Sequence, residues 1–188
     1  MSGRRAGYLR PVDSPNSRHV TTVATDAGLL ALWRASAFDD IHDYATWERR
    51  VEDRLAEAIR VGELVPVGIQ GDGAFGVRVA VAPDGLSDRE ARYAVVTSEP
   101  YLLVTDGTDL CLSGVEAVGD RSRSPWTGTV PAGRCAVRVV LVGRDEEPGA
   151  LGPDGSPASS ALADFVVLVA PADGTETFRT AEATFDPP

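Results

Sequence analysis

The dipeptide Asp-Gly occurs five times in this chain of 188 residues, at positions 72, 84, 106, 154 and 173, each time between apolar runs. Glycine accepts a positive φ and aspartate tolerates the left-handed region, so the pair favours tight chain reversals. Short apolar segments separated by repeated turns are typical of a β-sandwich or barrel. A doubly wound parallel sheet would need several crossover helices, and the chain offers only one convincing helix.

Hydrophobic alternation supports this prediction. The runs 75–81 and 135–142 alternate apolar with small or polar residues, as half-buried strands do, and the run 165–169 is continuously apolar. We expect the strand at 29–33 to pair with the strand at 19–24, and the turn at 106–109 to close a hairpin. The chain is therefore predicted to be α+β, mostly β: an antiparallel β-sandwich with one amphipathic helix packed against it.

The helix is predicted at about 44–61. Its apolar residues recur at intervals near four, which places them on one stripe; they are Trp47, Val51, Leu55, Ala58 and Ile59. Asp43 or Thr46 can cap the start of this helix, and Gly62 follows its end, where a left-handed terminator belongs.

One domain is expected. Residues 1–17 lack an apolar period and are predicted to form a flexible tail, leaving 18–188 as a single β-rich domain. Within that domain the run 143–160, rich in Gly, Pro, Asp, Glu and Ser, looks disordered. No apolar run approaches the ~20 residues that span a membrane. Cys111 and Cys135 are too few for a disulfide scaffold, so we expect a cytoplasmic protein with both thiols reduced.

The formal net charge is −10, and every basic residue is arginine. Nucleic-acid binders gain affinity from basic side chains that neutralise phosphates, and anionic lipid headgroups repel an acidic surface. The charge therefore argues against nucleic-acid and membrane partners. A basic protein is the partner class that it suits, although solubility alone also explains such a surface.

Catalytic motifs are nearly absent from the sequence. There is no nucleophile elbow, phosphate loop, dinucleotide fingerprint or zinc-protease motif, and the only histidines are His19 and His42. The acidic run 39–43 is interpreted as the approach to the helix N-terminus, where negative charge is favourable, rather than as a metal site. No cofactor or metal is predicted, and an enzyme is the less favoured class.

Four carboxylates remain as candidate binding residues. Glu99 and Glu116 flank the predicted 101–115 hairpin and could form a two-carboxylate pair of the glycosidase kind. Asp106, Asp109 and Glu116 resemble calcium ligands but fail the EF-hand spacing.

Trp126 is a candidate of another kind, because it lies in a polar loop between Pro125 and Thr127. An exposed tryptophan is a typical hot spot for a protein or sugar partner. The alternative is that its ring folds back onto the sheet.

Three stretches carry a resemblance: SEPYLLVTDG at 98–107, LCLSGVE at 110–116 and VPAGRCAVRVV at 130–140. They resemble a bacterial β-sandwich family of unassigned function, and their layout is distantly similar to the competence protein J family, small acidic β proteins that inhibit a secreted nuclease. The resemblance covers about the C-terminal half. It implies a fold more than a function, and no inhibitory residue carries over.

The favoured function is a non-catalytic interaction protein, of the inhibitor or immunity kind, whose acidic surface binds a basic protein. The alternative is a small-ligand or carbohydrate-binding β-sandwich module, calcium-dependent in one version, with Trp126 as its platform. An enzyme acting through Glu99, Glu116 or the acids at 39–43 is the third hypothesis.

Overall fold

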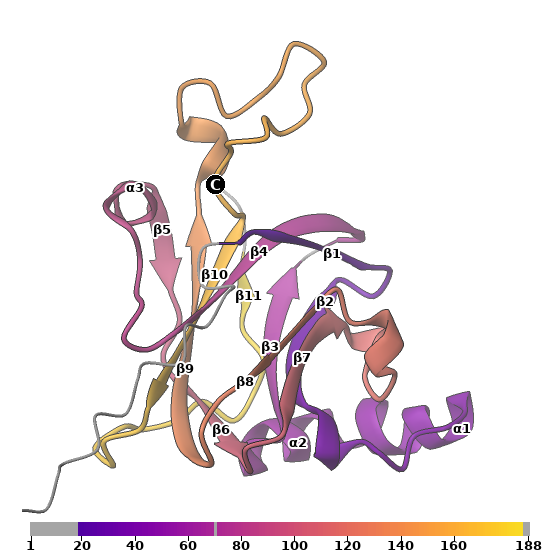
Figure 1. Cartoon of the computed structure of the whole chain (residues 1–188). Helices are drawn as coiled ribbons and strands as arrows, with labels where there is room; N and C mark the ends of the chain where they lie inside the picture. The colour runs from indigo at the N-terminus through magenta and orange to yellow at the C-terminus, as the bar shows by residue number, and fades with distance from the viewer. Residues whose placement is uncertain (1–18, 70, 186–188) are drawn as a thin grey trace, which may run out of the picture.

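The computed structural model describes residues 19–69 and 71–185, and the predicted tail at 1–17 lies outside them. Two β-sheets pack together, with helical segments at one end (Figure 1). In order, the strands of sheet A are β1 (Thr21–Thr25), β4 (Gly73–Val81), β10 (Phe165–Pro171), β9 (Gly133–Val142) and β5 (Ala94–Thr97), with β6 (Tyr101–Thr105) also paired to β9. Those of sheet B are β11 (Thr184–Phe185), β3 (Leu64–Ile69), β2 (Leu29–Arg34), β7 (Asp109–Gly114) and β8 (Trp126–Thr129). The predicted α+β, mostly β sandwich is confirmed.

Both sheets are mixed rather than wholly antiparallel. Strand β10 runs parallel to β4 and antiparallel to β9, and it lies between them at the centre of sheet A. Strand β11 is parallel to β3. Covering elements on both faces of β10 explain why its sequence, Phe-Val-Val-Leu-Val, is apolar without alternation.

The main core lies between the sheets. It contains alternate residues of sheet A, such as Val77, Val139 and Val167, together with Leu30 and Leu112 of sheet B, all at most 2% exposed. Alternation along each strand sends the intervening residues to the opposite face.

Two predicted pairings are wrong. The turn after β1 leads into sheet B, where β2 pairs with β3 and β7. Strand β1 stays in sheet A and pairs with β4. Likewise the residues 106–108 connect β6 in sheet A to β7 in sheet B, and the expected 101–115 hairpin does not form. Both turns join the two layers of the sandwich instead of two neighbours in one sheet.

The predicted helix at 44–61 is present, with an interruption. It consists of α1 (Tyr44–Trp47), a π-helical turn (Glu48–Glu52) and α2 (Leu55–Val61). Asp43 caps its start by accepting the backbone N–H of Thr46 at 2.8 Å. Gly62 ends it with φ +79°. Segment α2 packs against β3 and β6 and closes one end of the sandwich (Figure 1).

A short helix, α3 (Asp88–Arg92), covers the outer face of sheet A, where it was not predicted. Arg78 of β4 makes a two-pronged contact with Glu90, at 2.6 and 2.7 Å, and both side chains are less than 10% exposed. A second apolar cluster packs beside this pair and includes Ala80, Val140 and Val166.

The run 143–160 projects beyond the end of the sandwich opposite α1 and α2 (Figure 1). It contains a 3-10 turn at Arg144–Glu146 and an isolated bridge between Leu151 and Pro157. Among the residues described, no helix combines the length and the apolar character needed to cross a bilayer.

Candidate functional site

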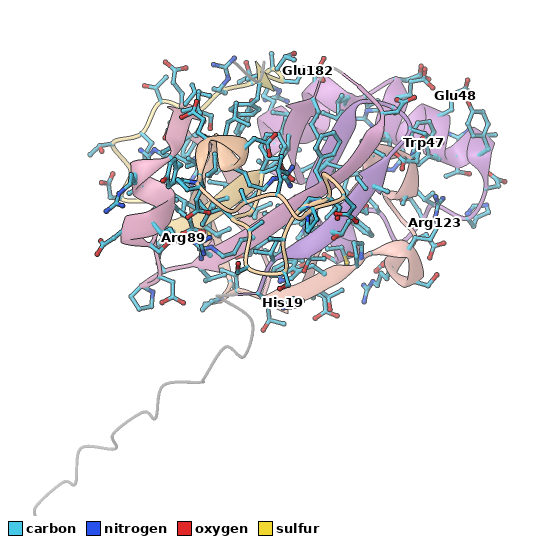
Figure 2. All side chains as sticks on the ribbon, turned by 90° about the horizontal axis from the view of Figure 1, so that it is seen from above. His19, Trp47, Glu48, Arg89, Arg123 and Glu182 are labelled. Atoms are coloured by element: carbon cyan, nitrogen blue, oxygen red, sulfur yellow. The ribbon has the colours of Figure 1, made fainter. Side chains whose placement is uncertain are left out.

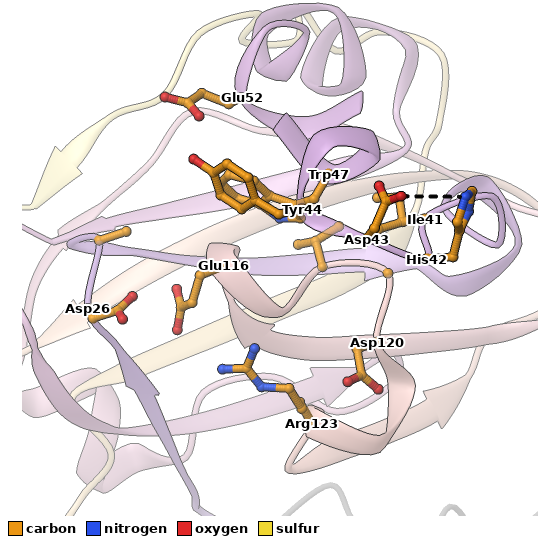
Figure 3. Close-up of a pocket in the computed structure, with 13 residues that line it drawn as sticks. Asp26, Ile41, His42, Asp43, Tyr44, Trp47, Glu52, Glu116, Asp120 and Arg123 are labelled. Carbon is orange, nitrogen blue, oxygen red and sulfur yellow. Dashed lines mark ion pairs between the residues drawn. The ribbon is translucent and has the colours of Figure 1, made fainter. Parts of the chain in front are cut away.

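An open pocket of about 820 Å³ lies between α1 and the chain that leaves β7 (Figure 3). Two 3-10 turns, Val115–Ala117 and Arg121–Arg123, form its second wall. Five carboxylates line it: Asp26, Asp43, Glu52, Glu116 and Asp120. Against them stands Arg123, and His42 lies 3.8 Å from Asp43. With His42 neutral, these lining residues carry a net charge of −4.

An aromatic pair forms the middle of this pocket. Tyr44 and Trp47 lie three positions apart on α1 and therefore share a helix face. Their rings stack, with centroids 5.7 Å apart and planes 24° from parallel. The indole Nε1 of Trp47 donates to the carbonyl oxygen of Val115 at 3.0 Å, which ties α1 to the opposite wall. Tyr44 is 69% exposed, the largest exposure among the large hydrophobic side chains that the structure describes.

Some of the carboxylates are fixed by local hydrogen bonds. The hydroxyl and backbone N–H of Thr46 lower the pKa of Asp43, and the same two groups of Ser122 lower the pKa of Asp120. Glu116 accepts a hydrogen bond from Thr25 Oγ1 at 3.1 Å. The bonds from Thr46 and Ser122 favour the ionised forms of Asp43 and Asp120.

Asp26 and Glu52 differ from the other three carboxylates. No side-chain hydrogen bond or ion pair engages either of them within the described part of the chain. Glu52 lies on one side of the Tyr44 ring, and Asp26 and Glu116 lie on the other (Figure 3). Trp47 and Arg123 lie on the same side of the molecule, opposite Arg89 (Figure 2).

A ring flanked by carboxylates can bind a cationic side chain, because the ring face and the acids attract the same charge. Within the described residues, no group of three His, Cys, Asp or Glu side chains is placed to hold a metal ion.

The carboxylates predicted from the sequence lie apart. Of the four, only Glu116 lies in this pocket. Glu99 is exposed, 3.5 Å from Arg179. The inference that Glu99 and Glu116 approach each other depended on the 101–115 hairpin, which does not form.

Asp106 and Asp109 have local partners of their own. Asp109 lies 3.7 Å from Arg121. Hydrogen bonds from Ser36 and Thr108 hold the pKa of Asp106 well below its usual range. Each of these two carboxylates thus has neighbouring cations or hydroxyl groups as partners.

Trp126 is buried. It lies on β8 with 6% of its surface exposed, and its ring packs over Gly128. Of the two alternatives, the ring folded onto the sheet is the one observed. Trp126 therefore offers no exposed platform to a sugar or protein.

Tyr44 was missed by the sequence analysis, although its spacing from Trp47 was a usable signal. Tyr44 follows the cap residue Asp43 directly, and the predicted apolar stripe begins only at Trp47.

A two-sheet sandwich with an acidic surface pocket around an aromatic stack is the class that this fold and site define. No protein-family model matches the sequence, and no curated protein matches it. Two solved structures share the fold. One is described as crocagin biosynthetic gene J, with 19% identity, a TM-score of 0.55, and coverage of 81% of this chain and 97% of that one.

The other is ComJ from Bacillus subtilis, an inhibitor of the DNA degrading activity of NucA. It has 4% identity and a TM-score of 0.52, with coverage of 84% of this chain and 98% of ComJ. At these identities the similarity concerns the fold alone. The structural resemblance to competence protein J that the sequence suggested is confirmed at that level.

Proposed function

We propose that this protein is a non-catalytic inhibitor or immunity-type protein that binds a basic protein partner through the pocket around Tyr44. The single observation that carries the proposal is the exposed Tyr44 ring, stacked on an anchored Trp47 and flanked by Asp26, Glu52 and Glu116. Tyrosine is one of the residue types enriched at interface hot spots. An arginine or lysine of the partner would meet both the ring face and the acids.

Two further facts support this function. The net charge of −10 favours fast encounter with a basic surface. The fold that the chain shares with ComJ, an inhibitor of the DNA degrading activity of NucA, supports the proposal. A DNA-degrading enzyme with a basic surface is accordingly the first partner class to test.

We place this activity in the cytoplasm. Cys111 and Cys135 are free and buried, and burial raises the pKa of both thiols. Such thiols suit a reducing compartment, and neither of them lines the pocket around Tyr44.

The test replaces Tyr44 with a photo-crosslinking phenylalanine analogue in the source cell. The matched control carries the same analogue at Leu151, which is 47% exposed on the projecting loop. A protein that crosslinks from position 44 and not from position 151 supports the proposal. Equal crosslinking from both positions, or none from position 44, contradicts it.

The captured partner is then purified and its affinity measured with and without added salt. Tyr44→Ala should weaken binding by roughly tenfold or more, and the Asp26→Asn, Glu52→Gln double variant by roughly threefold. Added salt should weaken binding further, because it screens the exposed charges. Tyr44→Ala should lower the free energy of unfolding by about 1 kcal/mol or less, because the side chain is mostly exposed and loses only its stacking on Trp47. An affinity that changes neither with salt nor in these variants would refute the proposed acidic interface.

A further inference from the structure

A second cavity, of about 380 Å³, lies at the end of the sandwich opposite α1 and α2. Its walls come from the same end of both sheets. In sheet A, β9 ends there and β4 and β10 begin there. In sheet B, β3 ends there, beside the two-residue strand β11. The apolar side chains that line it are Ile69, Phe75, Leu141, Val142, Phe165 and Phe185. The volume falls in the range of small-molecule sites, roughly 300–1,000 Å³.

Three phenylalanines form a connected wall of this cavity. The rings of Phe75 and Phe165 meet edge to face at 6.1 Å and 65°, and those of Phe165 and Phe185 at 5.9 Å and 66°. Phe165 and Phe185 are at most 4% exposed, whereas Phe75 is half-buried. A ring entering the cavity can continue this edge-to-face series, which is the geometry that aromatic groups prefer.

The rim of the cavity is polar and comes mainly from the Arg144–Glu146 turn. Arg144 contacts Asp164 at 2.9 Å, and each side chain is 18% exposed. Arg144 also lies 3.2 Å from Asp145. Asp164 accepts a further hydrogen bond from the backbone N–H of Gly76 at 2.6 Å. The charge of Arg144 is thus committed to two carboxylates, and with Glu146 the lining residues have a net charge of −2.

From the apolar wall and the acidic rim, we infer that this cavity binds a small amphipathic cation: an aromatic or branched apolar body with a protonated amine. The body would lie against Phe75 and Phe165, and the ammonium group would lie at the rim beside Asp145 and Glu146. An anionic ligand would face three carboxylates and a guanidinium that is already paired. This site shares no lining residue with the pocket around Tyr44, and it is independent of the proposed function.

Isothermal titration calorimetry on the full chain can test this with two probes of matched shape, phenethylamine and 3-phenylpropionate. We expect the amine to bind roughly tenfold more tightly than the anion, a difference of about 1.4 kcal/mol. Chemical-shift changes on the addition of phenethylamine should map to the amides of Phe75, Phe165 and Phe185. Equal binding of both probes, binding of neither, or shifts confined to another site would each overturn the inference.

Variants separate the rim from the wall. The Asp145→Asn, Glu146→Gln double variant keeps the shape of an exposed turn and should weaken phenethylamine binding by roughly threefold or more. Asp154→Asn, on the same projecting loop but outside the cavity, is the matched control and should leave the affinity unchanged. Tyr44→Ala should also leave the affinity for phenethylamine unchanged. The test of this cavity is therefore separate from the test of the pocket around Tyr44. Equal losses in the rim and control variants would contradict the inference.

Discussion

At the residue scale, two buried tryptophans differ in one hydrogen bond. Trp33 is fully buried, and its Nε1 donates to Ser113 Oγ at 3.0 Å. Trp126 is nearly as buried, yet its Nε1 meets no partner within the described residues. Burying an unpaired donor costs free energy that a paired donor avoids.

We predict that Trp33→Phe lowers the free energy of unfolding by about 1 kcal/mol more than Trp126→Phe does. Both substitutions remove the same atoms, so the loss of packing is similar and the hydrogen bond makes the difference. Urea unfolding followed by circular dichroism measures both costs. Equal costs, or a larger cost at Trp126, would show that the Ser113 contact contributes nothing.

The end of the helical segment depends on one glycine. Gly62 has φ +79°, and a Cβ built there would lie 2.9 Å from the side chain of Leu102. Its carbonyl oxygen also accepts the N–H of Val104 at 2.8 Å, which links α2 to β6. Only glycine meets these requirements without strain.

At the element scale, Gly62→Ala should therefore destabilise the protein by about 1 kcal/mol or more. Gly85→Ala is the matched control, because no atom lies within 4 Å of its Cβ position and its φ is not positive. The control should have little effect on the unfolding midpoint. Similar losses in the two variants would contradict the left-handed cap as the cause.

The contact between Arg78 and Glu90 anchors α3 on sheet A, and it makes stability depend on pH. Burial alone would raise the pKa of Glu90, but hydrogen bonds from Arg78 and Ser87 outweigh it and lower that pKa. Because the folded pKa is depressed, the stabilisation is present above the pKa of an unfolded glutamate, about 4.3. It is lost as the pH falls through the lower folded pKa.

Glu90→Ala should cost about 3–5 kcal/mol at neutral pH, because it leaves Arg78 buried without its carboxylate. The Arg78→Met, Glu90→Leu double variant should lower the free energy of unfolding much less, because neither member of the buried ion pair is then left without the other. Urea unfolding from neutral pH down to about pH 3 should show a weaker acid dependence in the double variant than in the parent. An unchanged acid dependence would show that this pair does not titrate as argued.

Local signals in the sequence predicted the elements well and their partners poorly. The stripe from Trp47 to Ile59, with Asp43 before it and Gly62 after it, located the helical segment, because caps and periodicity are local. The π-helical turn within it has no such signal. The turn at 106–108 specifies a chain reversal, but the choice between one sheet and two depends on distant strands.

The candidate site followed the same division. The acidic run before the helix was interpreted correctly as a cap at Asp43. Glu116 was predicted to pair with Glu99, but Glu99 lies outside the pocket. Its actual neighbours come from α1 and from the turn after β1, which only the folded chain brings together.

At the scale of the whole molecule, the two thiols report on opening of the sandwich. Cys111 and Cys135 are 0% and 3% exposed, on opposite sheets. Burial raises the pKa of each thiol, so little thiolate forms at neutral pH.

We expect both thiols to resist an aromatic disulfide reagent in the native protein and to react together in denaturant. The native reaction rate should track the unfolding equilibrium, which the Gly62→Ala variant shifts. Cys111→Ser and Cys135→Ser, measured separately, assign the rates. Rapid reaction of one thiol in the native state would indicate local opening of its sheet.

The position of β10 has a consequence for how the protein is made. Its neighbours β4 and β9 leave the ribosome first, and neither pairs with the other in the finished sheet. Until Phe165–Pro171 has been synthesised, β4 and β9 each lack the neighbour that lies between them in sheet A. Unpaired strand edges invite association with other chains. A chain that ends before β10 cannot complete sheet A, because β10 is the strand that joins β4 to β9.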